Sequence, residues 1–390
     1  MDEKNRTTIA FISRTMPMYR MPIIEQFDVH IEADVFLICS KDMVPGEKAI
    51  NFFDTSHVKT KLLKYKGGSI EIGNRRYPYG WFKKLFRTLD TIRPDVLVLE
   101  GESNFLNNVF LFFYCKVRSI PYIWWSCGRV RDQKESGVRK MLKPALGLLI
   151  KNASAVMGYS TYACRYFKET YGVSHRSTFV ACNSLSRKKV EQNIRCLKKE
   201  MSRTRKELGI SKGTPVLLYV GAVVREKNPD LFFNIYRQVK NVLPKTHAIF
   251  VGGGSYLDEM KRLSADVKDF HITGPIHENT ERYFLASDVF IMPGLGGLAL
   301  QQAMMCGLPV VCSVADGTEL DLVRNGQNGY FIEQGSSIEV WSEKIIRIIT
   351  DTEKRKKMGH ASKKIIDTSF NSDIMINRMI DCINYSLGGT

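Results

Sequence analysis

The sequence predicts an α/β protein made of two doubly wound, parallel-sheet domains. The length of 390 residues suggests two domains, at roughly 150 residues per domain. Short apolar strands alternate with helical segments in both halves of the chain, which is typical of such sheets. A content of 44% hydrophobic and 25% charged residues excludes a disordered polyelectrolyte and a fibrous protein.

Six short apolar runs in the first half are predicted to be buried strands. They are TIAFISR (8–14), ADVFLICS (33–40), DVLVLEG (95–101), PYIWWS (121–126), SAVMGYS (154–160) and STFVACNS (177–184). An apolar helical stretch, NFLNNVFLFFYCKVRS, lies between the third and fourth runs. Strands separated by helices of about a dozen residues favour right-handed βαβ units.

A charged helical segment at 187–210 separates the halves, and the strand pattern then restarts. The later strands are expected at 215–222, 247–254, 270–276, 289–294 and 308–314, with a helix at 228–243 and a closing amphipathic helix at 371–387. We therefore predict an N-terminal domain at 1–187, a C-terminal domain at 188–370 and a final helical segment at 371–390. A ligand is expected at the carboxyl ends of the strands, in a cleft between the domains.

The net charge of +17 is carried by the first half. Residues 1–210 hold 37 basic and 20 acidic residues, whereas residues 211–390 hold 20 of each. Three stretches, 58–68, 74–90 and 138–151, mix Lys and Arg with aromatic and apolar residues, which suits an anionic membrane surface. Solvated helix faces are the alternative. No nucleic-acid-binding motif occurs, so no nucleic-acid partner is expected.

The cysteines and the N-terminus indicate a cytoplasmic protein. The nine cysteines are odd in number and form no C-x-x-C pair, which favours free thiols in a reducing compartment. The acidic, polar start of the chain does not resemble a signal peptide, and no apolar run is long enough to span a membrane. We expect a location in the cytoplasm, free or peripheral on the inner face of the cytoplasmic membrane.

A glycine-rich loop is the sharpest motif, in GLGGLALQQAMMCGLPVV (294–311). It follows a strand and opens a helix at Leu298. Its glycines allow close approach to the backbone, and the free N–H groups at a helix start attract an anion such as a diphosphate. A plain strand–helix turn is the alternative.

Three other strand ends carry small or cationic residues. VGAVVREKNPD (220–230) places Arg225 and Lys227 after a strand, where cations would neutralise phosphate charge. A solvated basic turn is the alternative here. FVGGGSYLDEM (250–260) and FHITGPI (270–276) add glycine turns. Because all of these strand ends meet at one sheet edge, together they indicate a binding site.

These segments, together with ASDVFIMPG and ELDLVRNGQNGYFI, occur in order over roughly residues 214–333. The ordered set resembles retaining glycosyltransferases of the GT-B fold, in particular glycosyltransferase family four. The N-terminal half is a looser match, carried by YRMPIIEQF (19–27) and CNSL (182–185). The resemblance implies two Rossmann-like domains that face each other across a cleft, with a C-terminal helix that returns to the N-terminal domain.

The resemblance also implies that the C-terminal domain binds a nucleoside-diphosphate sugar. Lys227 falls at the position of the family's diphosphate-binding lysine, and Gln302 at that of the glutamate that binds the ribose. The remaining donor-binding positions that it implies are Gly221, Gly253, Gly274, Ile276, Gly296, Gly297 and Leu298.

Two departures from the family pattern concern the donor. The family commonly has two glutamates eight positions apart in this loop and helix, where this chain has Gly294 and Gln302. The Gly-Arg pair that often follows the first strand is Gly221-Ala222 here, so Arg225 is the nearest candidate partner for Lys227.

On the acceptor side, Glu100 lies where the family often has a histidine, and Glu102 lies nearby. A carboxylate at a strand end could take a proton from an acceptor hydroxyl; a solvated loop glutamate is the alternative. Ser126, Arg129 and Arg14 follow other strands and are expected at the same edge. The seven histidines are scattered, so no metal site is expected.

The implied reaction moves a sugar from a nucleoside diphosphate to an acceptor hydroxyl with retention, and needs no metal or other cofactor. The expected acceptor is a glycan or a lipid-linked molecule of cell-surface polysaccharide or glycolipid synthesis. Two alternatives stay open. One is a non-catalytic sugar-nucleotide-binding protein, favoured by the missing glutamates, and the other is a sugar-nucleotide epimerase or phosphorylase.

Overall fold

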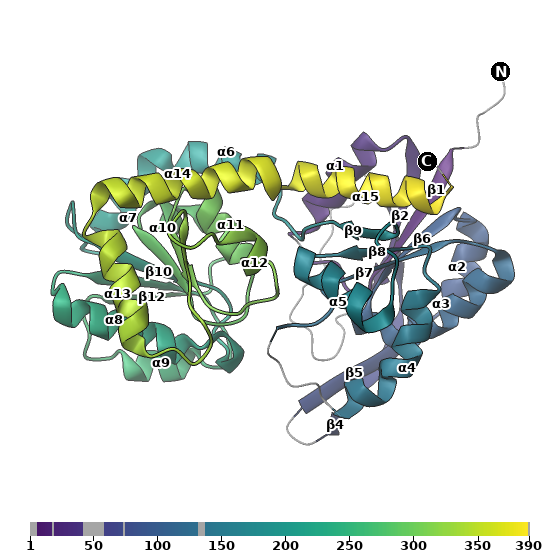
Figure 1. The fold of residues 1–390 in the computed structure, drawn as a ribbon, viewed down its shortest axis with the longest axis horizontal. Helices are drawn as coiled ribbons and strands as arrows, with labels where there is room; N and C mark the ends of the chain where they lie inside the picture. The colour runs from purple at the N-terminus through teal and green to yellow at the C-terminus, as the bar shows by residue number, and fades with distance from the viewer. Residues whose placement is uncertain (1–5, 18, 42–57, 73–74, 132–136, 389–390) are drawn as a thin grey trace. The chain divides into compact units, whose positions relative to one another are not determined.

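Two parallel sheets organise the chain (Figure 1). The computed structural model describes residues 6–17, 19–41, 58–72, 75–131 and 137–388. They form two compact units. The first takes its described residues from Met1–Arg129, Gln133–Ser186 and Ser372–Thr390, and the second from Val130–Asp132 and Arg187–Asn371.

The first unit contains a sheet of seven described strands in the order β3-β2-β1-β6-β7-β8-β9, all parallel. The strands are β1 (Thr7–Ile12), β2 (Ala33–Ser40), β3 (Lys59–Leu63), β6 (Val96–Glu100), β7 (Tyr122–Ser126), β8 (Ala155–Gly158) and β9 (Thr178–Val180). The helices are α1 (Met21–His30), α2 (Leu85–Ile92), the 3₁₀ turn η1 (Glu102–Asn104), α3 (Phe105–Arg118), α4 (Gly137–Lys151), α5 (Thr161–Tyr171) and α15 (Ser372–Ser386). Each strand predicted in this half is confirmed within a few residues.

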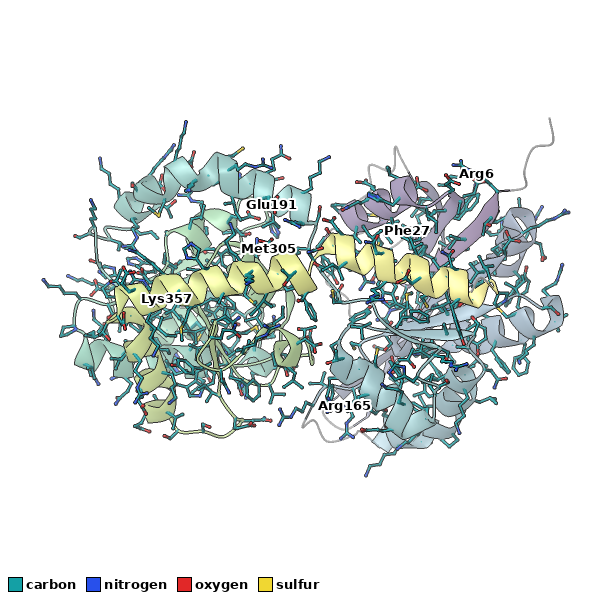
Figure 2. All side chains as sticks on the ribbon, turned by 45° about the horizontal axis from the view of Figure 1, so that its top comes forward. Arg6, Phe27, Arg165, Glu191, Met305 and Lys357 are labelled. Carbon is teal, nitrogen blue, oxygen red and sulfur yellow. The ribbon has the colours of Figure 1, made fainter. Side chains whose placement is uncertain are left out.

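Apolar side chains of both sheet faces build the core of the first unit. Phe27 of α1, labelled in Figure 2, is fully buried, and its ring meets that of Phe11 edge-on with the centroids 5.4 Å apart. Trp124 of β7 is fully buried on the sheet. Such near-continuous apolar strands are what a sheet covered by helices on both faces requires.

The basic stretches at 58–68 and 74–90 contain strands that the sequence did not predict. Residues 58–68 fall in β3 and β4 (Tyr65–Ile72), so this stretch is not a helix face. β4 pairs antiparallel with β5 (Arg75–Phe82) as a separate hairpin. β3 is an edge strand, and its lysines are of the kind that keep sheet edges from pairing with other chains. The stretch 138–151 is helical and lies in α4.

The C-terminal helix α15 belongs to the first unit, although it comes last in the chain. It packs on β7, β8, β9 and α1. Its buried residues are Met375, Ile376, Met379, Cys382 and Ile383. Gln26 of α1 donates a hydrogen bond to Asp373 over 2.6 Å. The predicted return of this helix to the N-terminal domain is confirmed.

The second unit contains a sheet of six described strands in the order β12-β11-β10-β13-β14-β15, all parallel. They are β10 (Val216–Val220), β11 (His247–Val251), β12 (Phe270–Gly274), β13 (Val289–Met292), β14 (Val310–Cys312) and β15 (Gly329–Phe331). The last of them was not predicted. This is the Rossmann strand order, with the switch point between β10 and β13.

Helices cover both faces of the second sheet. They are α6 (Arg187–Leu197), η2 (Lys198–Glu200), α7 (Met201–Glu207), η3 (Arg225–Lys227), α8 (Pro229–Val242), α9 (Leu257–Leu263), α10 (Glu281–Leu285), α11 (Leu298–Met305), α12 (Glu319–Leu322), α13 (Ile338–Ile349) and α14 (Thr352–Ser369). Met305 of α11, labelled in Figure 2, is buried, and α11 packs on α14.

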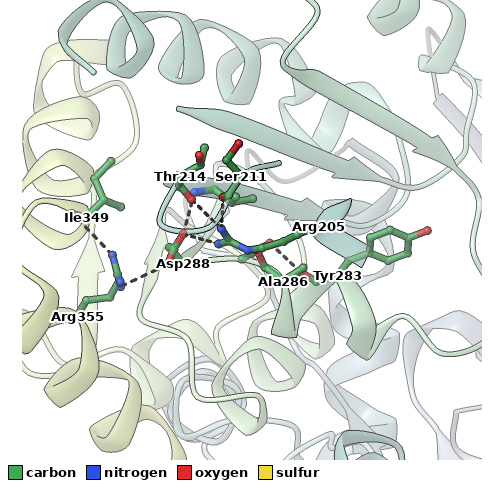
Figure 3. A network of polar contacts seen from close by, with 10 residues as sticks. Arg205, Ser211, Thr214, Tyr283, Ala286, Asp288, Ile349 and Arg355 are labelled. Atoms are coloured by element: carbon green, nitrogen blue, oxygen red, sulfur yellow. Dashed lines mark hydrogen bonds and ion pairs between the residues drawn. The ribbon is translucent and has the colours of Figure 1, made fainter. Parts of the chain in front are cut away.

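A half-buried polar network fixes α7 and α14 to the amino ends of β10 and β13 (Figure 3). Arg205 of α7 donates to the carboxylate of Asp288 over 3.0 Å and to the carbonyl oxygen of Thr214 over 2.9 Å. Arg355 of α14 lies 3.4 Å from the other oxygen of Asp288. The network leaves the carboxyl ends of the strands, at the opposite edge, for binding.

Candidate functional site

The carboxyl ends of β10 and β13 carry the glycine-rich and cationic loops of the second unit. These two strands are neighbours at the switch point, so the loop after β10 and the loop after β13 open beside each other. Asn228, which has a left-handed φ of 48°, donates from its side-chain amide to the carbonyl of Pro293 over 3.1 Å. The backbone N–H of Leu295 donates to the carbonyl of Glu226 over 3.2 Å. The two loops are therefore joined by one side-chain and one backbone hydrogen bond.

Gly294 lies where these loops are closest. A β-carbon at Gly294 would lie 2.6 Å from the carbonyl carbon of Lys227 and 2.7 Å from the carbonyl oxygen of Glu226. Real β-carbons do not approach backbone atoms so closely. A side chain at position 294 would therefore clash with the loop that carries Lys227.

Lys227 directs its ammonium group toward two of the predicted donor-binding glycines. Its Nζ lies 3.3 Å from the position of a β-carbon on Gly221 and 3.0 Å from that of a β-carbon on Gly296. Burial lowers the pKa of Lys227, while the negative charge of Asp316 acts in the opposite direction. The site thus holds a half-buried cation in a setting that disfavours its charged form when no anion is bound.

The start of α11 lies beside this cation. Gly296 has a φ of 152°, and Gly297 is the N-cap of the helix that begins at Leu298, with no side-chain cap. The first N–H groups of an uncapped helix and the positive end of its dipole attract anions. The structure thus brings together Lys227, Gly221, Gly296, Gly297 and Leu298, and the arrangement can hold a diphosphate.

Arg225 points elsewhere. Its guanidinium lies 5.5 Å from the ring centroid of Tyr256. Together with Asp230 and Asn234 it lines an open pocket of about 490 Å³. The hydroxyl of Tyr256 donates to Asp230 over 3.0 Å, which fixes the ring beneath the guanidinium. Arg225 and Lys227 therefore face different surroundings, although they belong to the same 3₁₀ turn.

The turns after β11 and β12 pack directly on the turn after β10. The N–H of Val223 donates to Gly253 over 2.9 Å, and the N–H of Gly252 donates to Gly274 over 3.0 Å. A β-carbon on Gly252 would lie 1.8 Å from the carbonyl oxygen of Gly221, so this contact requires glycine. Ile276, two residues beyond Gly274, is half-buried in the same turn.

Gln302 lies on α11 and is held by α10. Its amide nitrogen donates to the hydroxyl of Thr280 over 2.9 Å and to the carboxylate of Glu281 over 3.0 Å. Glu281 is buried. Since the amide nitrogen is used, the carbonyl oxygen of Gln302 is the atom that can accept from a ligand hydroxyl.

Asp316 and Thr318, in the loop after β14, also reach this site, and the sequence reasoning missed them. A β-carbon on Gly297 would lie 2.6 Å from Oδ2 of Asp316 and 2.6 Å from Oγ1 of Thr318. The Asp-Gly-Thr segment directly after a predicted strand was the available signal. The position of this segment beside α11 follows from the order of the strands in the sheet, where β14 is next to β13, and not from the sequence pattern.

In the first unit, Glu100 fixes the loop after β1. Its Oε2 accepts from the hydroxyl of Ser13 and from the backbone N–H of Arg14, each over 2.8 Å. β1 and β6 are neighbours at the switch point of this sheet. Arg14 is buried beside them. Glu100 and Arg14 are therefore brought together, and the hydrogen bond between them comes from the backbone N–H of Arg14.

Glu102 and Ser126 form a second cluster at the same edge. The hydroxyl of Ser126 donates to the carboxylate of Glu102 and accepts from the N–H of Gly128 over 2.9 Å. Arg139 of α4 lies 3.4 Å from the other oxygen of Glu102. Burial raises the pKa of Glu102, and the charge of Arg139 opposes the rise. Arg129 is half-buried, next to Gly128 in the chain.

Arg20, at the start of α1, was not predicted. It is buried, its guanidinium lies 4.6 Å from the ring centroid of Trp125, and it donates to the hydroxyl of Tyr159 over 2.9 Å. Its signal in the sequence is only a basic residue before a Met-Pro helix start. It adds a buried cation to the carboxyl edge of the first sheet.

Over the described ranges, no group of three His, Cys, Asp or Glu side chains is arranged to hold a metal ion. Nor does any helix in the described part of the chain have the length and apolar content needed to cross a membrane.

Residues 200–365 match the sequence model of the family described as Glycosyl transferases group 1. This region contains the loops after β10, β11, β12, β13 and β14, which build the site of the second unit. Through this region, the chain is similar to the glycosyl transferases group 1 family. The predicted resemblance is thus confirmed.

A curated protein that is similar in sequence comes from Corynebacterium glutamicum. It is a GDP-mannose-dependent monoacylated alpha-(1-6)-phosphatidylinositol monomannoside mannosyltransferase, 28% identical over 236 residues. The matched region is 57% of this chain and 60% of that protein. The chain therefore spans less than two thirds of that relative's length.

Two solved structures share the fold over nearly the whole chain. Anabaena HepE, in complex with UDP, has a TM-score of 0.74 at 16% identity and covers 97% of this chain and 99% of its own. WaaG, a glycosyltransferase involved in lipopolysaccharide biosynthesis, has a TM-score of 0.67 at 14% identity, with 96% and 99% covered. The predicted fold class of the chain is confirmed by these likenesses.

Proposed function

We propose that this chain transfers a sugar from a nucleoside-diphosphate sugar to an acceptor hydroxyl, with retention at the anomeric carbon. One observation carries the proposal: Lys227 directs its ammonium group at the uncapped start of α11, at the switch point of the second sheet. The similarity to the glycosyl transferases group 1 family and the UDP complex of the structurally similar Anabaena protein support the same ligand class.

In the proposed reaction, the bond between the anomeric carbon and the diphosphate breaks, and negative charge grows on the leaving oxygen. A preorganised cation and backbone N–H groups stabilise such charge, because they need no reorganisation during the reaction. Lys227 and the amides of Gly297 and Leu298 would supply this stabilisation. Arg225 would contribute from the rim, as its exposed guanidinium lies apart from Lys227.

The carboxyl edge of the first sheet is the proposed acceptor side, with Glu100, Glu102, Arg14, Ser126 and Arg129. Glu102 is the better candidate for taking a proton from the acceptor hydroxyl, because burial raises its pKa and so makes it a stronger base. Glu100 instead accepts two hydrogen bonds from the loop after β1, which suits a positioning role.

A panel of nucleotides and nucleotide sugars tests the proposed function. Purified protein is mixed with UDP, GDP and ADP and with their glucose or mannose derivatives, and thermal shift and nucleoside-diphosphate release are measured. We expect one base to raise the melting temperature, and release to require an acceptor. Release without an acceptor, or conversion of the sugar alone, would favour the epimerase or phosphorylase alternative. Binding without turnover under all conditions would favour the non-catalytic alternative.

We further propose that the acceptor is lipid-linked and that the first unit binds an anionic membrane surface in the cytoplasm. α3 carries an outward apolar stripe at helical spacing, formed by Leu106, Phe110, Phe113 and Val117. Val117 is 82% and Phe113 59% exposed, although such side chains are normally covered. The neighbouring helices add exposed cations, Arg87 from α2 and Lys140 and Lys143 from α4, so the surface suits anionic lipid.

The named relatives agree with this acceptor class, since one acts on a phosphatidylinositol mannoside and another in lipopolysaccharide synthesis. Co-sedimentation with vesicles of phosphatidylglycerol and phosphatidylcholine tests the membrane proposal. We expect binding to fall at least tenfold in the Phe110→Ser/Phe113→Ser variant, by loss of about 1.5–3 kcal/mol per ring. Val242→Ser on α8, also an exposed apolar residue, is the matched control. Equal binding by both variants would contradict the proposal.

A further inference from the structure

We infer that the carboxylate of Asp316, in the loop after β14, binds hydroxyl groups of the donor sugar in this chain. The inference rests on the proposed glycosyltransferase function and adds the residue that recognises the sugar. Gly294 offers the sugar no side chain, so another residue must supply the group that contacts the sugar.

Position 294 supplies no carboxylate in this chain. A β-carbon there would meet backbone atoms of Glu226 and Lys227 at 2.6–2.7 Å, and these are fixed by the hydrogen bonds that join the two loops. Any side chain would have to displace the lysine that is proposed to hold the diphosphate. A sugar-binding carboxylate must therefore come from another loop.

Asp316 comes from the adjacent strand and reaches the same turn. β14 is the neighbour of β13, and its loop brings both oxygens of Asp316 within 2.6–2.8 Å of the β-carbon position of Gly297. Asp316 also acts electrostatically on Lys227, so the carboxylate and the ammonium group share one region. A sugar attached to a diphosphate held by Lys227 and Gly297 would lie within reach of this carboxylate.

The carboxylate of Asp316 is held in a fixed orientation. Its Oδ1 accepts from the backbone N–H of Thr318 over 3.2 Å and from the Thr318 hydroxyl over 2.5 Å. Oδ2 has no contact of this kind among the hydrogen bonds of the described residues, so it can accept from a ligand. An ionised carboxylate accepts from two vicinal hydroxyls, and such charge-assisted bonds are strong.

A second carboxylate lies behind the first. Glu319 is fully buried, and its Oε2 accepts from the N–H of Gly317 over 2.8 Å. Burial raises the pKa of Glu319, and the nearby charge of Asp316 raises it further. Burial thus favours the neutral form of Glu319, whereas the less buried Asp316 lies beside Gly297.

The variant Asp316→Asn separates a binding role from a structural one. Asparagine forms the same turn with Thr318, because its side-chain oxygen accepts the same bonds, but it lacks the charge. Dissociation constants are measured by titration calorimetry for UDP, GDP and ADP and for UDP-glucose, GDP-mannose and ADP-glucose. The matched control is Asp258→Asn, whose side chain is 97% exposed on α9.

We expect Asp316→Asn to weaken the binding of the preferred nucleotide sugar at least tenfold, and that of the sugar-free nucleotide less than threefold. An equal loss for both would mean that Asp316 acts only through Lys227 or through stability, and would overturn the inference. Unchanged binding of the nucleotide sugar would overturn it as well. If wild-type protein binds none of the six compounds, the proposed function itself fails, which is a distinct result.

Discussion

Lys227 lies in surroundings that disfavour its charged form until an anion binds. We predict that Lys227→Ala reduces turnover about 10²-fold or more, by analogy with the loss of one oxyanion donor. Asn228 and Gly294, which fix its loop, stay in place in this variant. Steady-state kinetics with the preferred donor provide the measurement. Turnover within threefold of wild type would remove Lys227 from the site.

The lowered pKa of Lys227 also sets a pH dependence. The ammonium form binds the diphosphate, and burial lowers its pKa below the ordinary value for lysine, so the proton is lost at a lower pH than in an exposed lysine. We expect the affinity for the nucleoside diphosphate to fall as pH rises from about 7 to about 10. Lys227→Arg keeps its charge throughout this range, so this variant should show a flatter profile. Parallel profiles would contradict the assignment.

Gln302 cannot simply be replaced by the glutamate that the family commonly has at this position. Its amide donates to the buried carboxylate of Glu281 over 3.0 Å, so Gln302→Glu would place two carboxylates in contact. We predict a loss of about 1–3 kcal/mol in the free energy of unfolding, because a donor is replaced by a like charge. Chemical denaturation measures the loss. The double variant Gln302→Glu/Glu281→Gln, which restores a donor–acceptor pair, should recover most of it.

At the scale of single residues, the sequence indicated which residue types could bind a ligand, but not where their side chains point. Lys227 and the glycines of the β13 loop could be predicted, because cations and glycines after buried strands are recognisable as such. Arg225 lies two residues from Lys227 but turns toward Tyr256. Asp316, Arg20 and Arg139 could not be found from motifs, since they reach their clusters only through tertiary packing.

At the scale of elements, the loops after β10 and β13 behave as one unit. We predict that Gly294→Ala lowers the free energy of unfolding by about 1–3 kcal/mol, because the added methyl group meets the backbone of Lys227. Nucleotide binding should weaken with it. The control is Gly137→Ala at the start of α4, where no atom of the described residues lies within 4 Å of the new carbon. Equal stability of the two variants would show that the loop of Lys227 adjusts to a methyl group at position 294 with little loss of stability.

The strands were predictable where they are apolar, since buried parallel strands form continuous hydrophobic runs. β3, β4 and β5 were missed for the same reason. They are rich in lysine, arginine, glycine and tyrosine, and two of them pair outside the main sheet. β15 (Gly329–Phe331) escaped because it begins with glycine and follows the polar segment 325–328, so no long apolar run marks it. Their assignment depends on the partner strand rather than on their own pattern.

At the scale of the whole molecule, the apolar stripe of α3 lies in the unit proposed to meet the acceptor, and this unit carries +10 of the net charge of +17, from 28 basic and 18 acidic residues. The helix that completes this unit, α15, is supplied from the far end of the chain. We predict that ending the chain after Asn371 unfolds the first unit, because the helix buries Met375, Ile376 and Met379 there. Each such side chain contributes about 1.5–3 kcal/mol.

Hydrogen exchange can test this prediction strand by strand. Amides of β6 should lose protection in the shortened chain, whereas those of β10 should keep it, since the second unit contains none of α15. Loss of protection in both sheets would mean that the two units unfold together. Retained protection in β6 would mean that α15 is dispensable.

The first unit contains residues from both ends of the chain, and this affects the order in which the two units can fold during synthesis on the ribosome. The strands of this unit emerge first, but the surface of β7, β8 and β9 that α15 covers waits until the second unit has been synthesised. The later domain can therefore finish folding before the earlier one. During this interval the nascent chain exposes an apolar sheet face, which is the kind of surface that chaperones bind.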